Sequence, residues 1–203
     1  MPRTEHALLV AILGTACAPD LRDRLQRDDG NGLNTEDLAQ AGVLDTGADL
    51  TEPQEVVVDA QSETEWHPYD FERQGLVDVA LPWDLTFQRY RIRVNGGISG
   101  EEDVVAANLD DRVFDDVTAA DVPADGDPAW VTDASDADGD GEDEGAFADW
   151  YDYDPSTHIL TPKPRVTLVR TVEGAVVKVE VLDYYDDAGS PGFLRFRWAE
   201  LAL

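Results

Sequence analysis

The stretch WDLTFQRYRIRVNGGISG, from Trp83 to Gly100, says more about the fold of this chain than any other. Its apolar residues alternate with polar ones, as in a strand that buries one face. They occupy odd positions up to Phe87 and even positions from Tyr90 onward. A β-bulge shifts such an alternation by one residue, so we expect one long strand or two short strands joined by a bulge near Gln88. The NGG sequence at 95–97 then predicts a turn.

The rest of the folded part has the same kind of pattern. EVVVDA at 55–60 is a β-branched run that predicts a first strand. RVTLVRT at 165–171 and AVVKVEVL at 175–182 flank VEG, which predicts a hairpin with a short turn. FLRFRWAEL at 193–201 alternates apolar residues with arginines. No long window shows helical periodicity, so the sequence predicts an all-β fold.

The first 17 residues are typical of a bacterial lipoprotein signal peptide. An apolar run at 7–14 is followed by small residues and by Cys17, the only cysteine of the chain. The run is too short to cross a bilayer, so we expect Cys17 to become a lipidated first residue. A buried N-terminal helix is the alternative. Residues 18–54 are polar and acidic, which predicts a flexible linker before a single domain at 55–203.

The charge of the chain excludes several classes of partner. Its 203 residues include 44 Asp and Glu against 15 Lys and Arg, a formal net charge of −29. Such a field repels nucleic acid and anionic membranes, so we expect no nucleic-acid partner and membrane contact only through the lipid anchor. Three basic residues, Arg89, Arg91 and Arg93, nevertheless follow one another at alternate positions. They either pair with carboxylates across the sheet or hold the anionic groups of a ligand.

A second acidic feature is the Asp- and Gly-rich segment at 123–149, which we expect to be an exposed, mobile loop. Within it, Asp136, Asp138 and Asp140 fall at alternate positions before a glycine, as in a calcium-binding loop. The last ligand position of such a loop is Phe147 here instead of Glu. The sequence is therefore compatible with weak calcium binding and also with an unstructured acidic loop.

Two stretches of the sequence resemble the HmuY family, bacterial haem-binding lipoproteins of the outer membrane. They are the Trp83–Gly100 stretch and WYDYDPSTHILTPKPRVTLVRTVEGAVVKVEVLDYYDDAGSPGFLRFRWAEL, from Trp150 to Leu201. The resemblance covers the chain from Glu55 onward. It implies one all-β domain that holds haem between protruding loops. It also implies a secreted, lipid-anchored protein at the cell surface, which passes haem to an outer-membrane receptor.

Haem iron takes axial ligands such as His and Met. Met1 and His6 belong to the predicted signal peptide, which leaves His67 and His158 as the candidate ligands. The alternative for His158 is that it closes its loop by a hydrogen bond. No Ser or Cys with a nearby His forms a known catalytic arrangement, so we expect a binding protein and not an enzyme. The competing expectation is a surface binding module of the same fold that takes no haem and is stabilised by calcium.

Overall fold

A computed structural model describes residues 51–136, 139, 141 and 143–203. The predicted signal peptide with Cys17, and residues 18–50 of the predicted linker, lie outside the described residues. Asp138 and Asp140 of the predicted calcium loop lie outside them as well. Eleven strands and two short 3₁₀ helices make up the regular structure of the described part, which has no α-helix. The predicted all-β fold is therefore confirmed.

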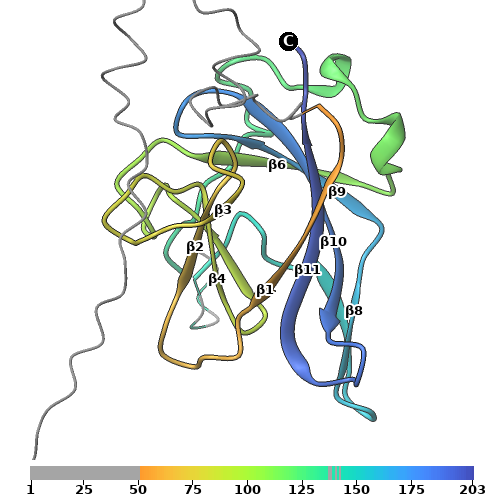
Figure 1. Ribbon diagram of the computed structural model, residues 1–203. Coiled ribbons are helices and arrows are strands. Elements are labelled where there is room, and N and C mark those ends of the chain that lie inside the picture. Colours follow the sequence, from red (N-terminus) through yellow and green to blue (C-terminus); the bar gives the residue numbers. More distant parts are fainter. Residues whose placement is uncertain (1–50, 137–138, 140, 142) are drawn as a thin grey trace, which may run out of the picture. The chain divides into compact units, whose positions relative to one another are not determined.

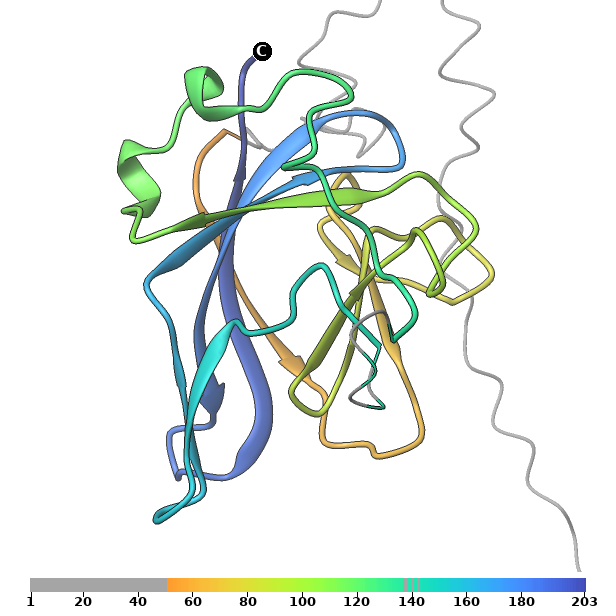
Figure 2. The ribbon, with the colours of Figure 1, turned by 180° about the vertical axis from the view of Figure 1, so that it is seen from behind.

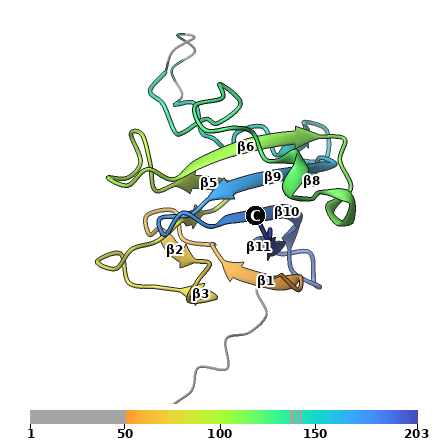
Figure 3. The ribbon, with the colours of Figure 1, turned by 90° about the horizontal axis from the view of Figure 1, so that it is seen from above.

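The larger sheet has five antiparallel strands in the order β1-β11-β10-β9-β6 (Figure 1). Seen from above, β6, β9, β10, β11 and β1 follow one another in that order (Figure 3). The predicted hairpin at 165–182 is confirmed, because Val176 of β10 pairs with Arg170 of β9. The strands are β1 (Gln54–Asp59), β6 (Val105–Asp110), β9 (Arg165–Arg170), β10 (Val176–Tyr185) and β11 (Pro191–Glu200).

A smaller sheet of four antiparallel strands, in the order β3-β2-β4-β5, packs on one face of the larger sheet. A separate hairpin, β7–β8, lies beside the ends of β10 and β11 (Figure 2), and the Leu160 N–H donates to the Tyr185 hydroxyl at 3.0 Å. The strands are β2 (His67–Asp70), β3 (Gly75–Leu76), β4 (Leu85–Gln88), β5 (Arg91–Val94), β7 (Tyr151–Asp154) and β8 (Ile159–Pro162).

The change of alternation in the Trp83–Gly100 stretch comes from a turn and not from a bulge. β4 and β5 form an antiparallel hairpin that is joined by Arg89 and Tyr90 alone, and Arg89 has a left-handed φ of 53°. Across such a turn each odd-numbered residue pairs with an even-numbered one, as Phe87 pairs with Ile92. Paired residues share a face of the sheet, so the two apolar sets lie together. The predicted bulged strand is therefore wrong.

The core between the two sheets is rich in aromatic side chains. Trp198 of β11 is fully buried, and its indole N–H donates to the Tyr69 hydroxyl at 3.1 Å. Phe71 packs edge-on against Trp198 with ring centroids 5.0 Å apart, and Phe87 stacks on Phe196 at 5.3 Å. Truncating one such ring to alanine costs about 3–5 kcal/mol. These contacts therefore fix the position of the smaller sheet on the larger one.

The opposite face of the larger sheet is covered by the segment that contains the 3₁₀ helices η1 (Phe114–Asp116) and η2 (Ala119–Asp121), and Phe114 and Val117 are its residues buried in the core cluster of that face. Phe114 is fully buried, and the charged groups of Lys178 and Arg197 lie over its ring at 4.5 and 4.4 Å. The Lys178 ammonium also donates to two backbone carbonyls of the covering segment. Basic side chains on this face are therefore used to hold the fold together.

The acidic segment at 123–149 is not exposed throughout. Val131 forms a β bridge with Ala106 of β6, and near the end of the segment Ala146 and Phe147 are buried. The prediction of an exposed loop is wrong for Ala146 and Phe147, whereas Val131 is 41% exposed. The buried residues pack in the same core cluster as Ile92 of β5, so they hold the end of the acidic segment beside β5, where the candidate site lies.

Candidate binding cleft

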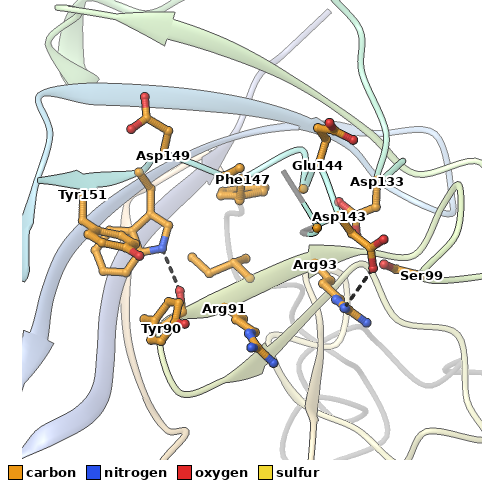
Figure 4. Close-up of a pocket in the computed structure, with 15 residues that line it drawn as sticks. Tyr90, Arg91, Arg93, Ser99, Asp133, Asp143, Glu144, Phe147, Asp149 and Tyr151 are labelled. Carbon is orange, nitrogen blue, oxygen red and sulfur yellow. Dashed lines mark hydrogen bonds and ion pairs between the residues drawn. The ribbon is translucent and has the colours of Figure 1, made fainter. Parts of the chain in front are cut away.

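A cavity of about 420 Å³ lies between β5 and the chain from Asp143 to Tyr151, and we refer to it as the binding cleft (Figure 4). Figure 4 shows Tyr90 and Tyr151 on one side of the cleft and the pair of Arg93 and Asp143 on the other. The lining combines aromatic rings, two arginines and several acids. It includes Tyr90, Arg91, Arg93, Asp133, Asp143, Phe147, Trp150 and Tyr151.

The aromatic wall of the cleft joins the β4–β5 turn to the start of β7. The Trp150 indole N–H donates to the Tyr90 carbonyl at 2.9 Å, which ties the two segments together. The rings of Tyr90 and Tyr151 meet edge-on with centroids 5.8 Å apart, and Trp150 meets Tyr151 at 4.8 Å. Trp150 is buried, whereas Tyr90 is 37% exposed. The wall therefore presents an accessible aromatic surface on a rigid support, against which a planar ligand can pack.

The arginines of the cleft project from β5, where Arg91 and Arg93 alternate with buried apolar residues. Arg93 stacks on Trp66 with its guanidinium 4.6 Å from the ring centroid. It also lies 3.9 Å from a carboxylate oxygen of Asp143, which makes a loose ion pair. Both partners hold the Arg93 guanidinium at the edge of the cleft.

Arg91 differs from every other basic residue of the described chain. The others each have a hydrogen bond or an ion pair, whereas Arg91 has neither to any described residue. Its guanidinium lies 5.8 Å from the centroid of the Tyr90 ring. Among the described residues, Arg93 is the one arginine of the basic run that pairs with a carboxylate, and Arg89 donates to the Gln61 carbonyl at 3.1 Å. The exposed guanidinium of Arg91 therefore has no described partner that would compete with an anionic group.

Asp133 connects β5 to the opposite wall of the cleft. It is 2% exposed, and its carboxylate accepts the Val94 N–H at 3.1 Å and the Ala146 N–H at 2.7 Å. Burial raises the pKa of Asp133, and these bonds and the charge of Arg93 oppose that effect. Nothing in the sequence separates Asp133 from the other aspartates of the acidic segment, so the sequence alone does not predict its role.

The turn predicted from NGG is confirmed, and it packs against Asp133. Gly97 has a φ of 63°, and a Cβ atom there would lie 1.9 Å from the Asp133 carbonyl oxygen. The same carbonyl accepts the Ile98 N–H at 3.0 Å. Only glycine combines this backbone conformation with such a close approach. The turn therefore fixes the end of β5 at the floor of the cleft.

The β7–β8 hairpin continues from Tyr151 of the cleft, and its turn carries His158. The backbone of His158 is left-handed, with a φ of 59°, and its N–H donates to the Asp154 carbonyl at 2.7 Å. The exposed imidazole forms a hydrogen bond between Nδ1 and the Tyr153 hydroxyl. His158 thus makes the loop hydrogen bonds that were the alternative to iron ligation, and its role as a ligand stays a prediction.

His67, the other predicted ligand, is half-buried at the start of β2. It lines a second cavity of about 620 Å³ together with Trp66, Leu76 and Val79, and the last two are 53% and 73% exposed. His67 begins β2 of the smaller sheet whereas His158 lies in the turn between β7 and β8, and no hydrogen bond or ring contact joins them in the part of the chain that the structure describes. The structure does not bring them together, so ligation by His67 also stays a prediction.

The predicted calcium loop is described only in part. Asp136 accepts the Gly139 N–H at 2.6 Å and the Gly141 N–H at 2.9 Å, one with each carboxylate oxygen. These hydrogen bonds shape the described part of the loop. Calcium binding through Asp136, Asp138 and Asp140 stays a prediction, because the last two lie outside the described residues.

A carboxylate cluster, formed by Asp70, Glu72, Asp84 and Glu173, lies at the turn between β9 and β10. Asp84 is fully buried and accepts the N–H groups of Phe71 and Val172, both at 2.9 Å. Burial raises the pKa of Asp84 to about 6, although both hydrogen bonds oppose the shift. The carboxylate therefore joins the smaller sheet to the turn at the end of β9.

Glu72 is the second perturbed group of the carboxylate cluster. Its Oε1 accepts the Thr171 hydroxyl at 2.7 Å, whereas Oε2 is buried and has no hydrogen-bond partner among the described residues. Burial raises the pKa of Glu72 to about 7, and the negative charges of Asp84 and Glu173 add to the shift. Carboxylate oxygens of Asp70, Glu72 and Glu173 lie within 4.8 Å of one another, which is close enough to hold a cation.

Comparisons with known proteins agree with this fold. The sequence model of the HmuY protein family matches residues 62–198 of the chain. A search of curated proteins found no match. Among the described residues no helix is long and apolar enough to cross a membrane.

Three solved structures share the fold at low sequence identity. An apo HmuY analogue from Tannerella forsythia has a TM-score of 0.57 at 16% identity, over 77% of this chain and 100% of its own. A Bacteroides vulgatus protein assigned as HmuY-like and haem-binding has a TM-score of 0.53 at 22% identity, over 73% and 92%. A Bacteroides fragilis protein assigned as a lipoprotein has a TM-score of 0.56 at 20% identity, over 73% and 89%.

Proposed function

The chain belongs to the HmuY family, and from this premise we propose that it is a haem-binding protein whose ligand occupies the binding cleft. The Bacteroides vulgatus neighbour that is assigned as haem-binding supports haem as the class of ligand. The cavity of about 420 Å³ lies within the range of about 300–1,000 Å³ that is usual for small-molecule sites.

The observation that carries this proposal is the unpaired Arg91 beside the aromatic wall. Haem is a planar apolar ring with two carboxylates at one edge, so it needs an aromatic surface and a cation side by side. Tyr90 and Tyr151 provide the surface, and Arg91 provides a cation that no described carboxylate neutralises. A charge-assisted hydrogen bond to a propionate is about twice as strong as a neutral one. Arg93, held by Trp66, is placed to receive the second propionate.

The donors available for iron also fit haem, although not as a pair of histidines. When bound, haem supplies an iron atom that takes axial ligands from the protein, and Tyr is one of the residues that serve. The described lining of the cleft contains Tyr90 and Tyr151 but no His, Met or Cys. Tyr153 and His158 lie next along the β7–β8 hairpin. In this proposal the cleft recognises the ring and the carboxylates, and the donors nearest to it for iron are its tyrosines and the β7–β8 hairpin.

The proposed role is that of a carrier and not of an enzyme. Lipidation at Cys17 would anchor the chain at the outer membrane, and the acidic residues 18–54 would serve as a tether. The Bacteroides fragilis neighbour that is assigned as a lipoprotein supports this location. Delivery of haem to an outer-membrane receptor completes the proposal, since a surface carrier passes its ligand to a transporter.

Titration with haemin tests this function. The full chain is purified without a polyhistidine tag, which binds haem itself, and absorbance is followed in the Soret region. We expect a saturable change at micromolar protein. If no saturable band develops and calcium raises the melting temperature instead, the chain is the calcium-stabilised module and the haem proposal is wrong.

A further inference from the structure

We propose that the binding cleft binds the two carboxylates of its ligand with unequal strength, because Asp143 competes for one of its two arginines. Arg91 binds one carboxylate directly, whereas Arg93 binds the second only when Asp143 releases it. Asp143 is thus a specificity-determining residue that limits the affinity for dicarboxylates. The inference rests on the proposed function, since it concerns the acid groups of a tetrapyrrole held in the cleft.

Strand β5 presents its two arginines on one face. Arg91 and Arg93 are two residues apart, and Ile92 between them is buried. Side chains two residues apart on a strand point to the same face, and a strand rises about 3.3 Å per residue. The two side chains therefore leave the strand about 7 Å apart. A ligand edge that carries two carboxylates matches this pair of guanidinium groups.

The two guanidinium groups differ in their surroundings. Arg91 lies 5.8 Å from the centroid of the Tyr90 ring and has no hydrogen bond or ion pair with any described residue. Arg93 lies 4.6 Å from the centroid of the Trp66 ring and 3.9 Å from a carboxylate oxygen of Asp143. Stacking on a ring leaves the N–H groups at the edge of a guanidinium available, whereas a carboxylate competes for them. The second carboxylate of a ligand therefore has to displace Asp143.

The backbone next to Asp143 is held in place, so its side chain is presented to the cleft. The Glu144 carbonyl accepts the Ala134 N–H at 2.8 Å, and Ala146 is buried. Figure 4 shows the Asp143 carboxylate directed at the Arg93 guanidinium. The two side chains are 49% and 36% exposed, respectively. Ion pairs with this exposure are weak, so a ligand carboxylate is able to replace Asp143.

Two other acids that line the cleft are engaged elsewhere. Asp133 is buried, and its carboxylate accepts two backbone N–H groups. Asp149 forms ion pairs with Lys163 and Arg165. Neither has to move when a ligand enters. Asp143 differs from both, because its ion-pair partner among the described residues is an arginine of the cleft itself.

The exchange at Arg93 breaks no covalent bond. One carboxylate leaves the guanidinium and another takes its place, so the number of charged contacts on Arg93 stays the same. At Arg91 the ligand adds a contact that the empty cleft lacks. The second carboxylate therefore contributes less to affinity than the first while Asp143 is present. Such a limit suits a carrier, which has to release its ligand.

Wild type and three full-length variants test the proposal: Asp143→Asn, Arg93→Gln and the double variant with both changes. Asp103→Asn, at an exposed aspartate outside the cleft lining, is the matched control for the loss of one negative charge. Each protein is titrated with protoporphyrin, which has two carboxylates and no iron, and with its monomethyl ester, which has one. Porphyrin fluorescence measures binding, and circular dichroism confirms that each variant is folded.

We expect Asp143→Asn to raise the affinity for protoporphyrin about threefold and the affinity for the monoester less than about 1.5-fold, since it removes a weak competing ion pair. In the Arg93→Gln background the same substitution should have no more effect than Asp103→Asn has in the wild type. Asp103→Asn should change the two affinities alike, because it alters only the overall charge.

Other outcomes overturn the proposal. If Asp143→Asn leaves the affinity for protoporphyrin unchanged, Asp143 does not compete with the ligand. If it raises both affinities equally, or acts as strongly without Arg93, it repels the ligand as a general charge. If haemin binds to the wild type but protoporphyrin does not, the carboxylates do not determine affinity, and the inference is wrong while the proposed function stands. If neither binds, the proposed function itself fails.

Discussion

Asp84 in the carboxylate cluster and Asp133 beside the binding cleft are both almost fully buried, and each accepts two backbone N–H groups from separate segments. Their surroundings differ in charge. Asp70 and Glu173 lie near Asp84 and disfavour its ionised form, whereas Arg93 lies near Asp133 and favours it. The first aspartate joins elements of the core, and the second joins the two walls of a cavity.

The difference bears on our proposal that this very acidic chain binds an anionic ligand. At Asp84 the hydrogen bonds alone hold the carboxylate, and no described cation pairs with it. Two arginines line the cleft together with Asp133, and one of them, Arg91, has no ion pair with any carboxylate that the structure describes. Basic side chains elsewhere in the described chain are consumed by ion pairs or by carbonyl oxygens. The unpaired charge of Arg91 therefore supports the proposal of a binding site in the cleft better than the size of the cavity does.

The largest expected effect is the loss of stability in Asp84→Asn. The amide keeps one acceptor oxygen, so either the Phe71 or the Val172 N–H loses its partner in a dry environment. We expect a loss of about 2–4 kcal/mol in the free energy of unfolding, measured by urea denaturation. Asp103→Asn, at an exposed aspartate, is the control and should change stability by less than about 0.5 kcal/mol. Equal values for the two variants would show that Asp84 does not join the elements as described.

Asp133→Asn should have a smaller effect on stability and a separate effect on binding. The loss of one bond to Val94 or Ala146 should cost about 1–3 kcal/mol. The walls of the cleft should also move apart, so haemin affinity should fall in Soret titrations below the unfolding temperature. Asp84→Asn is the matched comparison, since its folded fraction should bind normally. If both variants lose affinity alike, the contrast between the two aspartates is wrong.

The pH dependence of stability should separate the two regions further. The pKa of Glu72 is raised from 4.5 to about 7, so the folded state binds this proton more tightly than the unfolded state does. Glu72 therefore contributes to the free energy of unfolding below pH 4.5, and this contribution is lost as the pH rises to about 7. Glu72→Gln should flatten the fall in melting temperature between about pH 5 and 8 and be more stable than wild type at the upper end.

Glu63→Gln, at an exposed glutamate, is the control for removing one negative charge from the chain. It should reproduce only the general effect of reduced self-repulsion. If the melting temperature of Glu72→Gln changes with pH as steeply as that of Glu63→Gln, burial does not destabilise the ionised form of Glu72.

The smallest expected effect on stability belongs to Arg91→Gln. Arg91 has no hydrogen bond or ion pair with the described residues, so the free energy of unfolding should change by less than about 0.5 kcal/mol. Haemin affinity should nevertheless fall about tenfold, because a charge-assisted bond to a propionate is lost. Arg112→Gln removes the same charge from an ion pair with Asp121 outside the cleft lining and should leave haemin affinity unchanged.

Local patterns were sufficient to predict much of the fold. Alternation predicted the strands at 165–182 and 193–201, and NGG predicted the turn after β5. The phase change near Gln88 was read as a bulge, because a bulge and a two-residue turn shift the alternation alike. Only the pairing of Phe87 with Ile92, which is a tertiary fact, distinguishes them.

The candidate site was less predictable, because it depends on distant partners. Asp84 bonds the Val172 N–H, 88 residues later, and Asp133 bonds the Val94 N–H, 39 residues earlier. No local pattern marks either aspartate in so acidic a chain. The basic run could be seen in the sequence, but which of its arginines stays unpaired could not. His158 was noticed as a loop residue, whereas its bond to Tyr153 requires the turn geometry of the β7–β8 hairpin.

The most direct test of the central claim is a crystal structure of the full chain with ferric haem. We expect the ring against Tyr90 and Tyr151, with a propionate within hydrogen-bonding distance of the Arg91 guanidinium. A ring bound instead in the second cavity beside His67, with Arg91 still free, would contradict the assignment of the cleft as the haem site.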